Sequence, residues 1–88
     1  MKIKIFWKRD CPNCPQAKKV GKLIKDIISV EYLDVDTVDG LAESCIFNVM
    51  ATPSMVLVDD KNKEIESWRG MVPESDVIKR SISDKRKC

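Results

Sequence analysis

The fold is decided by residues 2–28, KIKIFWKRDCPNCPQAKKVGKLIKDII. The first six of these residues largely alternate in polarity and favour a strand, whereas the apolar residues from Ala17 to Ile28 recur at helical spacing. Cys11 and Cys14 lie where the strand gives way to the helix. A thiol at the first turn of a helix faces unpaired N–H groups and the positive end of the helix dipole, and both stabilise its thiolate. Because Cys14 follows about one turn later, the two thiols can close a disulfide, and the motif indicates dithiol chemistry.

The length and charge of the chain limit what it can be. Its 88 residues make a single domain, 1–88. Sixteen Lys and Arg against fourteen Asp and Glu give a net charge of +2 with the signs interspersed. Only Lys85-Arg86-Lys87 is clustered, so we expect residues 85–88 to be a frayed tail rather than a nucleic-acid face. No stretch has the pattern of a membrane span or a signal peptide, and we expect a cytoplasmic protein.

The cysteine and histidine content further limits the kinds of site that the chain can form. Four cysteines in a short chain can form a disulfide scaffold, but such scaffolds are secreted and rich in loops, whereas this sequence has regular patterns and no leader. The chain contains no histidine. Ser–His and Cys–His nucleophile pairs are therefore excluded, and so is the commonest transition-metal ligand.

The remaining elements follow from the same periodicities. Asn48 is expected to end a short helix, because asparagine tolerates the left-handed conformation of a helix C-cap. The other predicted elements are a strand at 30–35, the short helix through Leu41, Ala42, Cys45 and Ile46, strands at 54–58 and 64–68 joined by a turn at 59–63, and a last helix opened by Pro73-Glu74-Ser75-Asp76. The predicted order is βαβ–α–ββα.

This order resembles the thioredoxin-like fold in its minimal form. The Cys11-Pro12-Asn13-Cys14 motif resembles that of glutaredoxins and small archaeal-type thioredoxins, and residues 47–55 resemble the family segment that contains a cis-proline. The resemblance implies an α/β fold with a four-stranded mixed central sheet flanked by three helices. It also implies a cis bond between Thr52 and Pro53, which would expose the Thr52 backbone next to Cys11.

The resemblance implies a protein-disulfide oxidoreductase that acts in cell redox homeostasis and electron transport. Cys11, expected to be exposed at the helix start, attacks the substrate disulfide, and the less exposed Cys14 resolves the mixed disulfide. Pro12 stiffens the active-site loop. Asn13 occupies the position that tunes thiolate stability in related motifs.

Substrate contacts are expected from Thr52 and Pro53, and also from Trp7 and Arg9 beside the cysteines. The implied partners are disulfide-containing proteins, with a reductase or a low-molecular-weight thiol as electron donor. We expect a monomer that binds neither nucleic acid nor membrane and needs no cofactor beyond its own disulfide, although glutathione is possible.

Departures from the family patterns keep a glutathione-dependent glutaredoxin open as an alternative. Ile5 stands where typical thioredoxins place a buried aspartate, and Asn13 stands where typical glutaredoxins have tyrosine. Trp68-Arg69-Gly70-Met71 replaces the Gly-Gly of the glutathione site. The glutathione site is therefore only partly represented.

A zinc- or copper-handling protein is the second alternative, since two cysteines are half of a thiolate metal site. Copper chaperones end in a strand, whereas this chain is predicted to end in a helix, and a four-thiolate site would require Cys45 and Cys88 to converge. We therefore assign no metal ligands. Cys45 is expected to be a small buried apolar residue, Trp68 to serve packing, and Met50 to offer substrate an apolar contact.

Overall fold

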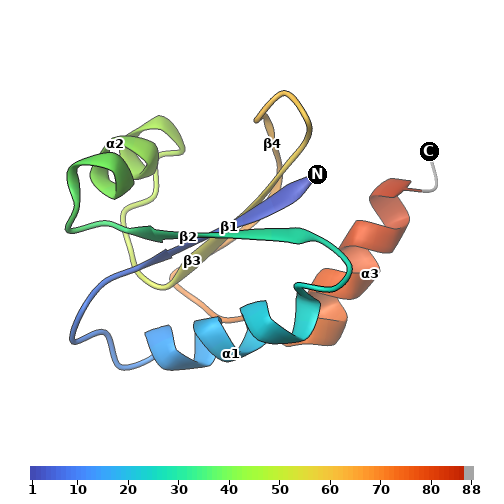
Figure 1. The fold of residues 1–88 in the computed structure, drawn as a ribbon, viewed down its shortest axis with the longest axis horizontal. Helices are drawn as coiled ribbons and strands as arrows, with labels where there is room; N and C mark the ends of the chain where they lie inside the picture. Colours follow the sequence, from blue (N-terminus) through green and yellow to red (C-terminus); the bar gives the residue numbers. More distant parts are fainter. Residues whose placement is uncertain (87–88) are drawn as a thin grey trace.

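A four-stranded sheet divides the molecule, with α1 and α3 on one face and α2 on the other (Figure 1). The computed structural model describes residues 1–86. The elements are, in chain order, β1 (Lys2–Trp7), α1 (Cys14–Ile24), β2 (Ser29–Asp34), α2 (Val38–Ile46), β3 (Ser54–Val58), β4 (Glu64–Arg69) and α3 (Ser75–Arg86). The predicted order and the predicted fold class are confirmed.

The sheet has the strand order β2-β1-β3-β4. β1 runs parallel to β2, with Lys2 opposite Ser29, and antiparallel to β3, with Ile5 opposite Met55. Two parallel neighbours need a crossover connection, and α1 provides it. This arrangement places the loop between β1 and α1, which carries the cysteines, at the end of a central strand.

Each face of the sheet has its own apolar core, because successive side chains of β1 and β3 point to opposite faces. β3 is buried along its whole length. The larger core lies under α1 and α3 and contains Ile3, Ile5, Ala17, Val20, Ile24, Ile28, Met55, Leu57, Trp68, Ile78 and Ile82. The smaller core lies under α2 and contains Phe6, Leu33, Phe47, Val49, Val56 and Val58. The predicted packing role of Trp68 is confirmed.

The predicted extent of the first helix is wrong at its C-terminal end. α1 stops at Ile24, whose carbonyl oxygen accepts hydrogen bonds from the backbone N–H groups of Ile27 (3.0 Å) and Ile28 (3.1 Å). The chain turns there because Ser29 must pair with Lys2 at the start of the parallel strands. Ile28 still reaches the larger core, whereas Leu23 is exposed to solvent.

Three other elements have boundaries that differ from the prediction. β4 covers residues 64–69 rather than 64–68. β2 covers residues 29–34 rather than 30–35. α3 continues to Arg86, so Lys85 and Arg86 belong to a helix instead of a frayed tail. Cys88 lies outside the described residues.

The end of α2 confirms the role predicted for Asn48, which has a φ of 55°. The backbone N–H groups of Asn48 and Val49 donate to the carbonyl oxygens of Cys45 (3.2 Å) and Ser44 (2.8 Å). The burial predicted for Cys45 is wrong, since its thiol is free and exposed. α2 is rotated so that its small residues Gly40 and Ser44 face the sheet, and Cys45 therefore lies on the solvent side of the helix.

A buried lysine fastens α2 to the sheet. Lys4 on β1 points to the α2 face, where its ammonium group contacts Glu43 of α2 at 2.5 Å and Glu31 of β2 at 2.9 Å. Burial by itself lowers the Lys4 pKa, but the hydrogen bonds to Glu43 and Glu31 outweigh it and raise the pKa above its ordinary value. The hydrogen bond between Lys4 and Glu31 also lowers the pKa of Glu31. One buried cation thus joins two strands and a helix.

Candidate active site

The two cysteines of the motif form a disulfide at the start of α1, with Cα atoms 5.3 Å apart. The Cys14 backbone N–H donates to the Cys11 carbonyl oxygen (3.3 Å), which folds the loop into a turn. Asn13 is the N-cap of α1, and its carbonyl oxygen accepts a hydrogen bond from the Ala17 N–H (3.3 Å). Pro15 falls within the first turn, where its missing N–H costs little.

Both cysteines are buried in this oxidised state. Cys11 is 7% exposed and Cys14 is 3% exposed. The expected order of exposure is therefore correct, but the expectation that Cys11 is openly exposed is wrong. The disulfide bond to Cys14 holds the Cys11 side chain at the start of α1.

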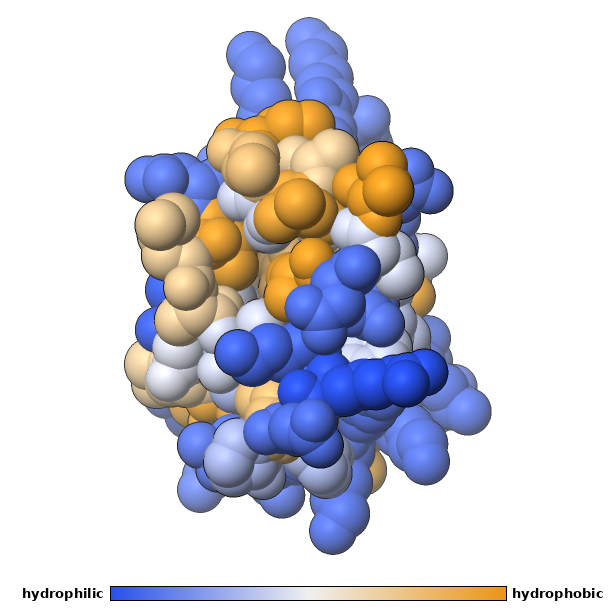
Figure 2. All heavy atoms as spheres, turned by 90° about the vertical axis from the view of Figure 1, so that its left-hand side faces the viewer, coloured by the Kyte–Doolittle hydropathy of each residue, from blue (hydrophilic) through white to orange (hydrophobic). Residues whose placement is uncertain are grey.

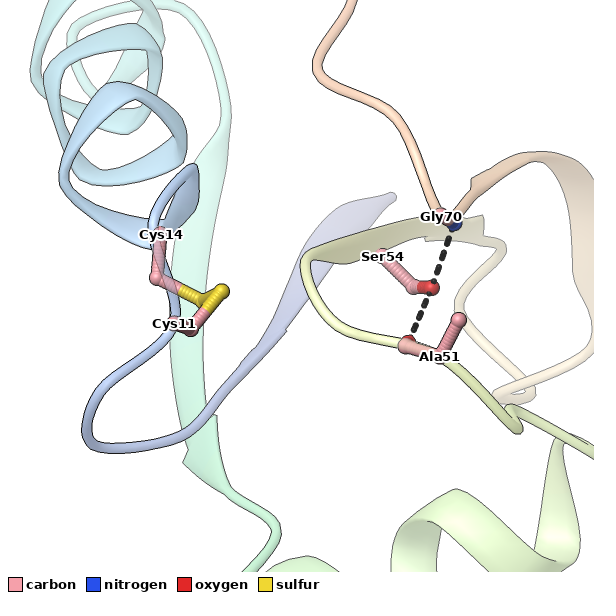
Figure 3. The surroundings of a disulfide bond; sticks show 5 residues. All are labelled: Cys11, Cys14, Ala51, Ser54 and Gly70. Carbon is pink, nitrogen blue, oxygen red and sulfur yellow. Dashed lines mark hydrogen bonds between the residues drawn. A yellow bond between two sulfur atoms is a disulfide. The ribbon is translucent and has the colours of Figure 1, made fainter.

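That second loop contains the Thr52–Pro53 peptide bond, which is cis as the family resemblance implied. Figure 3 shows the disulfide sulfurs directed toward the turn that carries Ala51. A pocket lies between the two loops. It is lined on one side by Lys8, Asp10, Cys11 and Pro12, and on the other by Val35, Met50, Ala51 and Thr52. Cys11 therefore meets an open pocket, and Thr52 forms part of its wall.

A buried serine fixes the position of the second loop. The Ser54 hydroxyl donates to the Ala51 carbonyl oxygen (2.7 Å) and accepts a hydrogen bond from the Gly70 backbone N–H (3.1 Å) (Figure 3). It thereby ties the turn at Thr52 to the end of β4. Sequence reasoning missed Ser54. The feature of the sequence that could have indicated its role is its position directly after Thr52 and Pro53.

Three predicted substrate residues, Trp7, Arg9 and Pro53, are not among the residues that line this pocket. Trp7 lies in a separate hollow with Tyr32, and the Lys18 ammonium group sits 3.6 Å from the Trp7 ring centroid. Arg9 is exposed in the loop beside the pocket. Pro53 is buried behind Thr52. Substrate contact by Trp7, Arg9 and Pro53 stays a prediction.

Two other kinds of feature are absent from residues 1–86. In that part of the chain, no three His, Cys, Asp or Glu side chains lie close enough together to hold a metal ion. None of its helices has both the length and the apolar character that crossing a lipid bilayer requires.

Comparison with known proteins agrees with the site geometry. Residues 1–83 match the family model described as a thioredoxin domain. A thioredoxin of Methanocaldococcus jannaschii is 31% identical over 64 residues, which cover 68% of this chain and 73% of that protein. A probable thioredoxin of Archaeoglobus fulgidus is 35% identical over 60 residues, which cover 65% of each chain.

The solved structures give the same assignment of the fold. Thioredoxin 1 of Thermosipho africanus superposes with a TM-score of 0.69 at 22% identity, covering 98% of this chain and 99% of the other. The chain belongs to the thioredoxin domain family. With its Cys11–Cys14 disulfide, it falls in the class of thiol–disulfide oxidoreductases.

Proposed function

We propose that this protein exchanges disulfides with protein substrates through the Cys11–Cys14 couple. One observation carries the proposal: the Cys11–Cys14 disulfide borders a pocket whose opposite wall is the loop that contains the cis Thr52–Pro53 bond. A substrate disulfide placed in that pocket meets Cys11 before Cys14, because Cys11 lines the pocket and Cys14 lies deeper.

The reaction starts from the reduced protein. The Cys11 thiolate attacks one sulfur of the substrate disulfide, so that a Cys11–substrate bond forms and the substrate S–S bond breaks. The other substrate sulfur leaves as a thiolate and takes a proton from water. Cys14 then gives up its proton and attacks Cys11 Sγ. The Cys11–Cys14 disulfide closes, the second substrate thiol is released, and two electrons have passed to the substrate.

Substrate binding is assigned to the wall opposite Cys11. An extended peptide can pair with the backbone at Thr52, as an added strand pairs with a sheet edge. Met50 is exposed at the rim of the pocket and offers a flexible apolar contact. A reductase or a low-molecular-weight thiol then returns two electrons to the disulfide. We assign the protein to the cytoplasm as a monomer.

The test uses the reduction of insulin with dithiothreitol as electron donor. Cys11→Ser should lower the rate to that of the uncatalysed reaction, because no attacking thiolate remains. Cys14→Ser, reduced first and then mixed with insulin after dithiothreitol has been removed, should accumulate mixed disulfides with substrate that appear on non-reducing gels. Cys45→Ser is the matched control and should keep the full rate, because Cys45 is an exposed thiol outside the pocket.

Full activity of Cys11→Ser would show that the nucleophile is assigned wrongly. Replacing dithiothreitol by glutathione tests the electron donor. Rapid turnover with glutathione and small mixed disulfides, without reduction of insulin, would overturn the proposed substrate class in favour of a glutaredoxin.

A further inference from the structure

The helix α2 has its apolar side turned to solvent. Val38, Leu41, Ala42, Cys45 and Ile46 follow the spacing of a single helical stripe, and all five are exposed. The exposed fractions are 85% for Val38, 55% for Leu41 and 70% for Ile46.

The opposite side of α2, which faces the sheet, carries the buried residues Gly40 and Ser44. A surface helix normally buries its apolar stripe, so this reversed orientation leaves an apolar surface without a partner in the described chain.

The segments on either side of α2 reach the pocket beside Cys11. Val35 precedes α2 and Met50 follows it, and both line that pocket. Figure 2 shows the face that carries α2 above and the loop between β1 and α1 below, and hydrophobic residues gather in its upper half. A protein whose disulfide reaches Cys11 therefore approaches the face of the molecule that carries α2.

The charges around the exposed apolar stripe of α2 indicate which kind of partner can bind there. No Lys or Arg occurs between Glu31 and Lys61, and Asp36 and Asp39 are exposed beside the stripe. Two copies of α2 facing each other would bring these carboxylates together, which opposes self-association through this surface. A partner with apolar and basic residues meets the surface with complementary charge.

We propose that α2 is a docking surface for the redox partner, and that this partner carries apolar and basic residues on one side of its reactive disulfide. The proposal rests on the proposed function, since it places the partner's disulfide at Cys11. It assigns Leu41 and Ile46 to partner recognition, separate from the sulfur chemistry.

The test compares three chromogenic probes reduced by the reduced protein. Two are peptides that end in a cysteine joined by a disulfide to a small coloured thiol, one with Leu and Lys before the cysteine and one with Ser in their place. The third is the small disulfide without peptide. Each reduction consumes the Cys11 and Cys14 thiols and releases two thiols. Rates are corrected with the Cys11→Ser protein, which retains Cys45 and Cys88.

We expect the second-order rate constant of reduction to be about tenfold higher for the Leu–Lys peptide than for the Ser peptide. Leu41→Ser/Ile46→Ser should remove this preference and leave the rate with the small disulfide unchanged. Leu23→Ser is the matched control, because Leu23 is an exposed leucine on α1 that does not line the pocket. It should keep the preference.

Every other outcome is informative. Equal rates for the two peptides, or a preference that survives the double substitution, would overturn the docking surface while the proposed function stands. An equal loss of rate on all probes would also overturn it, since general damage would explain the variant. A dimer in sedimentation that the double substitution dissociates would assign the surface to a second copy. If the wild type reduces no probe, the proposed function itself fails.

Discussion

The Ser54 hydroxyl donates a hydrogen bond of 2.7 Å to the carbonyl oxygen of Ala51, across the turn that contains the cis peptide bond. Ser54→Ala removes this bond and also leaves the Gly70 N–H without its acceptor. We expect a loss of about 1–2 kcal/mol in the free energy of unfolding, measured by urea denaturation. Insulin reduction should slow as well, because the wall opposite Cys11 loses its support.

The matched control for this change is Ser29→Ala, which removes an exposed hydroxyl on β2. It should change stability by less than about 0.5 kcal/mol. If the two alanine variants are equally stable and equally active, Ser54 does not fix the loop.

The Lys4–Glu31 contact predicts how stability depends on pH. The hydrogen bond from Lys4 lowers the Glu31 pKa, so this pair contributes stability above the unfolded carboxyl pKa of about 4.3. The contribution is lost as the pH falls through the lower folded value. Lys4→Met keeps the buried volume but removes the charge. Its unfolding free energy should therefore fall less steeply than that of the wild type between about pH 5 and pH 3.

Lys2→Met provides the control for that measurement, since Lys2 is only half-buried and its ammonium group lies 3.7 Å from the Glu31 carboxylate. It should keep most of the wild-type slope. Parallel curves for wild type and Lys4→Met would contradict the assigned coupling.

Gly40 is required by a close approach of two backbone segments. A Cβ atom at this position would collide with the carbonyl oxygen of Asp34, which accepts hydrogen bonds from the Thr37 backbone and side chain at the start of α2. Gly40→Ala should therefore destabilise the fold by about 1–3 kcal/mol, although alanine favours helices by about 1 kcal/mol. Urea denaturation followed by circular dichroism measures the change. A more stable variant would mean that the Asp34 backbone yields easily.

Arg69 joins the end of β4 to the end of α2. Its Nη2 atom donates to the Phe47 carbonyl oxygen and to Glu64 Oε1, both at 2.7 Å. The hydrogen bond from Arg69 lowers the pKa of Glu64. In Arg69→Ala, this pKa should rise toward its ordinary value of about 4.3, as followed by NMR titration of the Glu64 carboxyl. Arg69→Lys should restore only part of the shift, because lysine lacks the planar fork. An unchanged Glu64 pKa in the alanine variant would refute the contact.

The local patterns of the sequence were sufficient to predict the order of helices and strands and the pairing of Cys11 with Cys14. Residues 2–7 have strand periodicity, and residues 54–58 form a short apolar run typical of a buried strand. The motif at Cys11 lies between a strand and a helix in both sequence and structure. The cis bond at Pro53 followed from the family resemblance rather than from proline chemistry. These features depend on neighbours in the chain or on a shared pattern.

What the sequence did not reveal depends on contacts between distant residues. Lys4 looks like an outward residue of an alternating strand, and its burial depends on Glu31 and Glu43 from two other elements. Cys45 was predicted to be buried because apolar helical stripes usually face a core. Gly40 and Ser44 reverse that orientation by admitting the close approach of the helix to the sheet.

The sheet divides the apolar core into a larger and a smaller cluster, and this difference affects how readily each helix unfolds locally. α1 and α3 rest on the larger apolar cluster, whereas α2 rests on the smaller one and on the ion pairs of Lys4. The free energy of local opening should therefore be lower for α2 than for α1 and α3. Amide hydrogens of α2 should exchange with solvent through local unfolding, while those of Val20 and Ile24 wait for global unfolding. The face beside the disulfide can then adapt its shape while the helix that carries Cys14 stays folded.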